Sequence, residues 1–287
     1  MGLAYLLVLP ALVIFGVFIF FPFFKNFDLA LHRVPPFPGL PTKYVGFDQF
    51  SDVLGSQDFR DSLWHTAVFA LITVPSGILL GLLLANVAHQ KLRGISIYRT
   101  IFSSTVATSV AVASVIFGTL FNPRVGLLPW LGISPTPPIL ENPSWALPAV
   151  AITTVWQNLG LSFILMSAGL QAIPDEVLEA AEVDGASPTS RFWRVTVPLL
   201  SPTIFFAVVV GSIFALQTFG QIDILTQGGP GGPRGKTNVL TYFIFTELRQ
   251  RRNPGTAAVL AIVLFAITLA LTLLQMRFLE RRVHYER

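Results

Sequence analysis

Six long stretches without a charged side chain divide this chain of 287 residues. When histidine is counted as neutral, they cover residues 1–24, 62–90, 100–123, 142–174, 195–222 and 253–276. A helix needs about 20 apolar residues to cross the hydrocarbon core of a bilayer. Only 12% of all residues are charged, against the roughly 25% that is usual in soluble domains. We therefore predict an all-α integral membrane protein with six transmembrane helices.

The whole chain, 1–287, is predicted to form a single transmembrane domain. The expected spans are about 3–24, 66–88, 100–121, 146–169, 199–222 and 255–276. A large soluble helical protein is the alternative, but six such stretches would leave no polar face to cover them. The first stretch has no basic residue before it and no small-residue cleavage pattern after it. We therefore expect a membrane span there and not a cleaved signal peptide.

The residue types present exclude several kinds of chemistry. There is no cysteine, so disulfides and thiolate chemistry are excluded. The four histidines are scattered at no ligand-like spacing: His32, His65, His89 and His284. No metal site and no catalytic residues are therefore expected. The net charge of +4 is interpreted as loop charge that sets orientation, not as a nucleic-acid surface.

The distribution of basic residues predicts the orientation. An even number of spans places both termini on one side of the membrane. Two short segments on that side carry seven cations, namely Lys91, Arg93, Arg99, Arg277, Arg281, Arg282 and Arg287. Because cytoplasmic loops are enriched in lysine and arginine, we predict a multi-pass protein of the inner or plasma membrane with both termini in the cytoplasm. The outer connections, 25–61, 124–141 and 223–252, are rich in proline or glycine and are expected to have little structure of their own.

The stretch "QGGPGGPRGKT", residues 227–237, ends like the phosphate-binding loop of an ATPase. That motif requires a glycine five residues before Gly235, and position 230 is a proline. A second proline, Pro233, removes a backbone N–H that would line the phosphate site. We interpret the stretch as a chance similarity and expect no nucleotide to bind here.

The inner connection 171–198 contains the signals of two short helices. Pro174 suits a first helical position, and acidic residues follow it in the first turn. Gly185 is a natural C-terminal cap for this first helix. Ser187 and Pro188 can begin a second helix, which Pro198 is expected to end. The connection is predicted to be a rigid, sharply bent element at the cytoplasmic face.

This connection also carries a family signature. The residues Glu179-Ala180-Ala181, then Gly185, then Val195-Thr196-Val197-Pro198 resemble the EAA signature of permease subunits of binding-protein-dependent ABC importers. The resemblance implies the type I ABC importer permease fold and makes the connection a coupling helix that docks on a separate ATPase. It assigns ATPase coupling to Glu179, Ala180, Ala181, Asp184, Gly185 and Pro198. The departures are mild, with valine in place of the usual isoleucine at 195 and of leucine at 197.

The resemblance also implies partners for the chain. They are a dimer of ATP-binding subunits, a second homologous permease and an extracytoplasmic solute-binding protein. ATP and magnesium would bind to the ATPase, and this chain would bind no cofactor. The segments "QIDILTQGGP" and "RFLERRVHYER" look most like the A-type permease of importers for sn-glycerol-3-phosphate and glycerophosphodiesters, a carbohydrate-type group. The basic extension usual at the start of that family is missing, so we expect a longer native N-terminus.

Polar side chains within the fourth and fifth spans are candidates for a path taken by a small polar solute. Polar residues in apolar spans are costly and usually face a cavity or another helix. The candidates are Trp156, Gln157, Asn158, Ser162, Gln217, Thr218, Gln221 and Asp223. Hydrogen bonding between helices is the alternative explanation for each of them. By resemblance to maltose-type permeases, the middle of these two spans would line the path.

The absence of cations from the six stretches bears on the cargo. A phosphate monoester is a dianion near neutral pH and is usually bound by arginine, lysine or helix N-termini. Such a cation would have to come from the rim, such as Lys25 or Arg124, or from a partner. We therefore expect a glycerophosphodiester or a sugar rather than free glycerol phosphate. An ion-coupled carrier or channel is the alternative function, although its spans usually contain ionisable residues, and a membrane-embedded enzyme would need a catalytic cluster.

Overall fold

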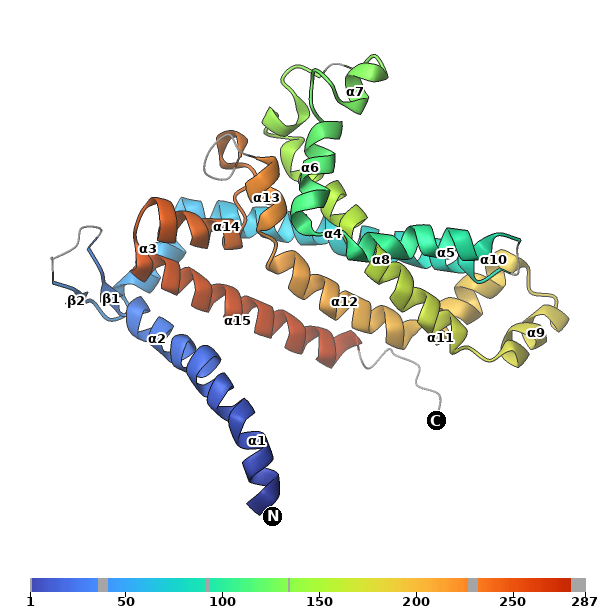
Figure 1. Ribbon diagram of the computed structural model, residues 1–287, viewed down its shortest axis with the longest axis horizontal. Coiled ribbons are helices and arrows are strands. Elements are labelled where there is room, and N and C mark those ends of the chain that lie inside the picture. The colour runs from blue at the N-terminus through green and yellow to red at the C-terminus, as the bar shows by residue number, and fades with distance from the viewer. Residues whose placement is uncertain (1, 36–40, 91–92, 134, 227–231, 280–287) are drawn as a thin grey trace.

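The computed structural model describes residues 2–35, 41–90, 93–133, 135–226 and 232–279, and these form an almost entirely helical protein (Figure 1). The α-helices are α1 (Gly2–Phe15), α2 (Phe21–Ala30), α3 (Asp48–Gly55), α4 (Gln57–Ala88), α5 (Ile95–Ser104), α6 (Val110–Leu120), α7 (Leu127–Trp130), α8 (Ala146–Gln171), α9 (Asp175–Val183), α10 (Pro188–Arg191), α11 (Val197–Leu199), α12 (Ser201–Leu216), α13 (Gly220–Leu225), α14 (Leu240–Phe245) and α15 (Pro254–Leu279). The π-helical turns are η1 (Gly16–Phe20), η4 (Phe192–Thr196) and η6 (Thr246–Gln250), and the 3-10 turns are η2 (Thr105–Ala107), η3 (Ile139–Glu141) and η5 (Pro233–Gly235). Two short strands, β1 (His32–Arg33) and β2 (Lys43–Tyr44), pair antiparallel.

Four helices are long and apolar enough to cross a membrane, and two bent pairs of helices also pass this test when each pair is taken together. Four candidate spans are continuous: Leu7–Ala30, α4, α8 and Pro254–Phe278 of α15. Two more are bent pairs, with Ile95–Ala107 and Val110–Leu120 meeting at 106° and Pro188–Leu199 and Ser201–Leu216 meeting at 67°. The described part of the chain therefore has four to six candidate spans, depending on whether each bent pair counts as one.

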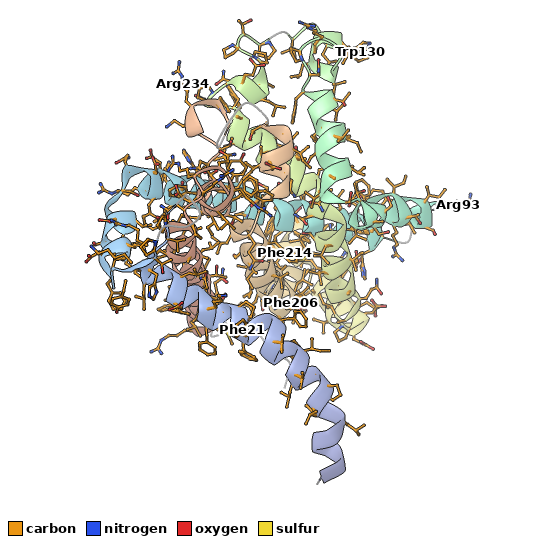
Figure 2. All side chains as sticks on the ribbon, turned by 60° about the vertical axis from the view of Figure 1, so that its left-hand side comes forward. Phe21, Arg93, Trp130, Phe206, Phe214 and Arg234 are labelled. Atoms are coloured by element: carbon orange, nitrogen blue, oxygen red, sulfur yellow. The ribbon has the colours of Figure 1, made fainter. Side chains whose placement is uncertain are left out.

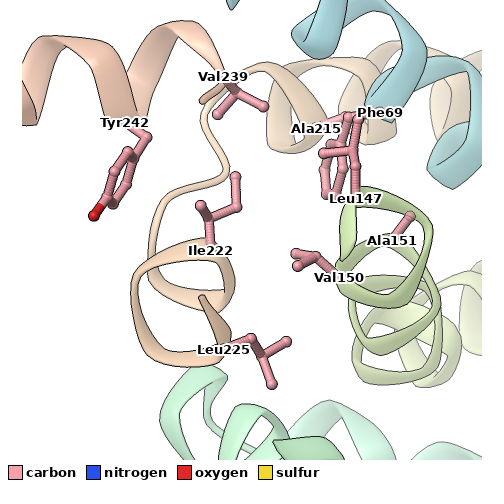
Figure 3. Close-up of a cluster of buried hydrophobic side chains, with 9 residues drawn as sticks. All are labelled: Phe69, Leu147, Val150, Ala151, Ala215, Ile222, Leu225, Val239 and Tyr242. Carbon is pink, nitrogen blue, oxygen red and sulfur yellow. The ribbon is translucent and has the colours of Figure 1, made fainter. Parts of the chain in front are cut away.

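Glycines allow the central helices of the bundle to approach closely. A Cβ on Gly81 of α4 would lie 2.7 Å from Cβ of Ser162 and 2.9 Å from its backbone carbon on α8. A Cβ on Gly160 of α8 would lie 2.7 Å from the backbone nitrogen of Val106. Small residues serve this purpose in membranes, where helices associate by van der Waals packing. One cluster of buried side chains then joins α4, α8, α12, α13 and α14 (Figure 3): Phe69, Leu147, Val150, Ala151, Ala215, Ile222, Leu225, Val239 and Tyr242.

The bundle has two distinct ends (Figure 1). At one end, which we call the loop end, α9, α10, η4 and α11 form the connection 171–198. At the opposite end, the hairpin end, β1 and β2 lie beside α3 and the start of α15. The connection 171–198, which is expected to face the ATPase, therefore lies far from the first long connection, 25–61.

The third and fifth spans differ from the straight helices that were expected. The third span breaks at Thr108, and Ser109 caps α6 by accepting a hydrogen bond from the backbone N–H of Val112 at 3.2 Å. The fifth span was expected over 199–222, but α12 ends at Leu216 and α13 is a separate helix. Serine caps of this kind satisfy N–H groups that a helix start leaves unpaired, so a break is stable even within an apolar stretch.

The second helix of the connection 171–198 ends at Leu199, one residue after its expected end at Pro198. The helix continues through η4 and α11 to Leu199, and the bend follows at Leu200. Just before the proline, the N–H of Val197 bonds to the carbonyl of Phe192, five residues back, in a π-helical turn. A wider turn of this kind accommodates a residue that lacks an N–H.

The outer connections contain more regular structure than was expected. The segment 25–61 includes the end of α2, the β-hairpin, α3 and the start of α4, and the segment 223–252 includes α14 and η6. Glu247 in η6 is only 3% exposed and forms an ion pair with Arg251 at 2.6 Å. Within the glycine-rich stretch, residues 227–231 lie outside the described residues. Its described part forms the 3-10 turn η5, between α13 and α14.

The N-terminal helix leaves the bundle as an arm (Figures 1 and 2). In the most apolar part of the span Leu7–Ala30, no residue is buried within the chain. Contact with the bundle begins in α2, where the rings of Phe23 and Phe265 of α15 lie 5.4 Å apart. The arm, α1 and η1, thus exposes apolar side chains on all sides over residues 7–20.

Candidate functional site

The first helix of the connection, α9, begins and ends at residues suited to these positions. Asp175 and Glu176 lie in its first turn, where carboxylates favour the positive end of the helix dipole. At the other end, the N–H of Ala186 bonds to the carbonyl of Ala181 and the N–H of Gly185 to that of Glu182, both at 3.0 Å. These two bonds form a Schellman motif, with Gly185 in the left-handed conformation at φ +80°. The predicted stop at Gly185 is present in the structure.

The second helix of the connection starts immediately after this turn. The Ser187 hydroxyl accepts a hydrogen bond from the backbone N–H of Ser190 at 3.3 Å. Arg191 then reaches back to Glu182 of α9, with 2.5 Å between Nη1 and Oε2. An exposed ion pair contributes at most about 1 kcal/mol, so the two backbone caps do most to set the bend between the helices.

The faces of α9 have different surroundings. On its inner face, Leu178 packs against a core cluster that includes Leu170 and Ile173. Beside it is a groove of about 530 Å³, bounded by the ends of α4 and α8 and by α9, α10 and η4, whose charged lining is Asp175, Glu179, Glu182 and Arg191. On the outer face, Ala180 is exposed and Val183 is 87% exposed. An acidic groove thus lies behind a small apolar face.

Most of the predicted coupling residues lie together on this element. Glu179, Ala180, Asp184 and Gly185 are exposed, and Ala181 is half-buried. Pro198 lies apart, half-buried in α11. The two exposed valines of α9, Val177 and Val183, were not predicted from the sequence. The spacing of Val177, Ala180 and Val183, one every three residues, could have indicated an apolar face.

Two of the predicted path residues form an amide cluster, in which Gln221 is buried and Gln157 is half-buried. The amide nitrogen of Gln221 donates to the side-chain oxygen of Gln157 at 2.9 Å, and the amide nitrogen of Gln157 lies 3.5 Å from the backbone carbonyl of Thr108. Gln221 is 5% exposed. The cluster joins α8, α13 and the break before α6. Thr108 was not predicted from the sequence, and its carbonyl is free of a helical partner because the helix breaks there.

The other predicted path residues do not converge on the amide cluster. Asn158 and Ser162 line a separate cavity of about 50 Å³ between α4, α8 and α12, which has room for a few waters at most. Thr218 lies in the break between α12 and α13, and its hydroxyl donates to the carbonyl of Phe214 of α12 at 3.0 Å. The remaining three residues are placed as follows: Trp156 packs on Phe117 with 5.4 Å between ring centroids, Gln217 is exposed, and Asp223 is half-buried.

The four to six apolar candidate spans and the two-helix connection at one end of the bundle are features of a polytopic membrane protein. The chain belongs to the family described as the binding-protein-dependent transport system inner membrane component, whose model matches residues 77–285. The predicted family is thereby confirmed.

Individual relatives and solved structures agree with this assignment. The chain is 37% identical to the sn-glycerol-3-phosphate transport system permease protein UgpA of Rhizobium meliloti (strain 1021), over 99% of this chain and 96% of the relative. It is equally similar, with the same coverage, to the UgpA of Agrobacterium fabrum (strain C58 / ATCC 33970). The fold resembles a crystal structure of a bacterial ABC transporter that imports the acidic polysaccharide alginate, with a TM-score of 0.82, 23% identity and coverage of 98% of this chain and 96% of that one.

These similarities establish the broad character of the chain. It is an inner-membrane permease subunit with the type I ABC importer permease fold, and it is not itself an enzyme. The prediction of an all-α membrane protein of this fold is confirmed.

Proposed function

We propose that this chain is the membrane-spanning subunit of an ATP-driven importer. A separate ATPase dimer binds ATP and magnesium, grips the connection 171–198 and pulls on the bundle through it. An extracytoplasmic binding protein delivers the solute at the hairpin end, and both termini lie in the cytoplasm. The proposal rests on one observation above all: α9 is a capped, exposed helix held to the bundle by a rigid bend in a chain of this family.

The connection is suited to transmit force. Packed elements move as units, whereas a flexible loop would absorb the motion. Ala180 and Val183 provide a small apolar face that allows close approach. Glu179 lies between this face and the acidic groove, where a basic side chain of the ATPase can reach it. The predicted coupling role of Glu179, Ala180, Ala181, Asp184, Gly185 and Pro198 is part of this proposal.

A second permease subunit is the proposed partner within the membrane. Two apolar surfaces of the chain support it. The arm of α1 and η1 has no buried side chain over residues 7–20, and α6 exposes Val112, Val115 and Ile116 on one face. A homologous subunit of the same length can cover both surfaces and complete a path between the two chains.

The proposed cargo is a small solute rich in hydroxyl groups. The relatives are named as permeases for sn-glycerol-3-phosphate, and the similar crystal structure is of an alginate importer. The glutamine amides of the cluster offer both donors and acceptors, which suits hydroxyl groups. The six uncharged stretches provide no lysine or arginine to meet a phosphate dianion. A glycerophosphodiester or a sugar therefore suits these spans better than free glycerol phosphate.

Transport by the reconstituted complex tests the proposal. The chain would be co-expressed with its ATPase, second permease and binding protein and placed in proteoliposomes. We expect uptake of labelled glycerophosphodiester or sugar to require both ATP and the binding protein. Uptake that persists without ATP and responds only to an ion gradient would favour the ion-coupled carrier. Tight binding of glycerol-3-phosphate to the receptor, with no diester or sugar binding, would refute the cargo assignment.

Substitution of Gln221 with leucine tests the amide cluster. The change removes the donor to the half-buried amide of Gln157. It also removes an amide that a hydroxyl-rich solute would bond in the proposed path. The loss of one such bond, about 1.5 kcal/mol, is expected to raise the KM for uptake about tenfold. Uptake kinetics in proteoliposomes measure this, and Gln217→Leu at an exposed position of the same region is the matched control. Equal kinetics for the two variants would exclude the cluster from the path.

A further inference from the structure

Four segments meet in a cation-rich hollow at the hairpin end, which we call the basic hollow. Its volume is about 530 Å³, and its charged lining is Arg33 of β1, Lys43 of β2, Asp52 of α3, and Arg251 and Arg252 from the turn between η6 and α15. This is the end of the bundle farthest from α9 (Figure 1). Neither the amide cluster nor the connection 171–198 includes any of these residues.

Ion pairs and buried hydrogen bonds hold the walls of the hollow in place. Arg33 pairs with Asp52 at 3.0 Å between Nη2 and Oδ2, which joins β1 to α3. Buried Gln49 of α3 donates to the carbonyl of Ala30 at 2.9 Å and so ties α3 to the end of α2. Because several elements fix the hollow, a partner would find its charges already positioned.

Arg251 connects the hollow to the start of α4. Its guanidinium pairs with Glu247 at 2.6 Å and with Asp58 at 3.4 Å. Burial would lower the pKa of Arg251, but the carboxylates of Glu247 and Asp58 outweigh this and raise it. Arg251 therefore stays cationic and has its charge balanced within the chain.

The two other cations of the hollow are not balanced in this way. Lys43 and Arg252 are exposed and form no ion pair with any residue that the structure describes. Arg252 also has the left-handed backbone conformation, at φ +52°, and the neighbouring N–H of Asn253 bonds to the carbonyl of Glu247 at 2.8 Å. The hollow thus offers two free positive charges on a rigid wall.

We propose that the basic hollow docks an acidic surface of the extracytoplasmic binding protein, an inference that rests on the proposed function. Free cations on an exposed rim attract a large partner of opposite charge and orient its approach. A small anion in the hollow would be left with the exposed side chains of Lys43 and Arg252, because Asp52, Glu247 and Asp58 already occupy the guanidinium groups of Arg33 and Arg251. The arrangement therefore favours the macromolecular partner over a phosphate ion.

The experiment measures association of the binding protein with the assembled transporter. Lys43→Glu and Arg252→Glu are each made in the complete complex, and Arg124→Glu, also exposed but on the connection 124–141, is the matched control. We expect the association rate at low salt to fall at least about tenfold in each hollow variant and to change little in the control. The difference is expected to shrink as salt is raised, because salt screens charges on an exposed rim. Basal ATP hydrolysis is expected to stay unchanged, which shows that the variants are folded and assembled.

The outcomes separate this inference from the proposed function. If the unaltered transporter shows no response to the binding protein, the proposed function fails and this inference with it. If the unaltered transporter responds and both hollow variants associate at its rate, the docking surface alone is overturned. Lys43→Cys in this cysteine-free chain tests on which side of the membrane the basic hollow lies. Labelling by a membrane-impermeant reagent in intact cells is expected, and labelling only after the cytoplasm is opened would also overturn the inference.

Discussion

Replacing Gly185 with valine is expected to lower ATP-driven uptake at least about tenfold while the permease still inserts and assembles. Gly185 has φ +80°, a conformation that β-branched residues rarely adopt, at a cost of roughly 1–2 kcal/mol. A Cβ at this position would meet nothing within 4 Å, so the effect comes from the backbone alone. The Schellman turn would unwind, and the second helix would leave α9 in another direction. ATP hydrolysis and uptake, measured on the same proteoliposomes, are expected to become uncoupled, with uptake falling at least about tenfold.

Gly132→Val is the matched control for this substitution. Gly132 also has a left-handed conformation, at φ +76°, and an added Cβ would again meet nothing within 4 Å, but it lies on the connection 124–141. We expect its valine variant to keep ATP hydrolysis and uptake coupled. Normal coupling in the Gly185 variant, or the same loss in both variants, would contradict the role assigned to α9.

Gly81→Ala is expected to have the largest effect on the stability of the bundle. The added Cβ would lie 2.7 Å from Cβ of Ser162 and 2.9 Å from its backbone carbon, and a backbone atom of α8 cannot rotate away. The two helices must separate, which costs on the order of 1–3 kcal/mol by analogy with overpacked cores. We expect a lower yield and a lower midpoint of thermal unfolding in detergent.

Gly77→Ala provides the control one turn earlier on the same face of α4. There the added Cβ would lie 3.8 Å from the Ser162 hydroxyl, an ordinary contact. We expect this variant to match the unaltered protein in yield and thermal midpoint. Equal midpoints for both alanine variants would show that α4 and α8 are not held as closely as the structure describes.

The gross fold could be predicted because uncharged stretches long enough to cross a bilayer are rare in other proteins. The length of an uncharged stretch does not show where a span bends, so the bends in the third and fifth spans could not be predicted in this way. The break at Thr108 and Ser109 lies inside an apolar stretch, without the glycine or proline that would mark it. Its only local signal is the capping side chain of Ser109. A single serine in a span is more often a contact between helices.

In the candidate sites, features set by neighbouring residues could be predicted, whereas contacts between residues distant in the sequence could not. The stop of α9 at Gly185 depends on a few neighbouring residues and was predicted. The pairing of Gln157 with Gln221 depends on how α8 and α13 pack, 64 residues apart in the chain. The basic hollow was missed for a related reason: charged residues between spans mark a connection, but only the folded chain shows which of them meet.

The free-standing arm of α1 and η1 has a consequence for how the transporter is made. Within lipid, a helix satisfies its own backbone hydrogen bonds, so this arm needs no neighbour to keep its shape. If the second permease covers the arm in the finished complex, the two subunits can be synthesised at different times, each waiting in the membrane for the other. A subunit without its partner would then keep the apolar side chains of residues 7–20 in contact with lipid alone.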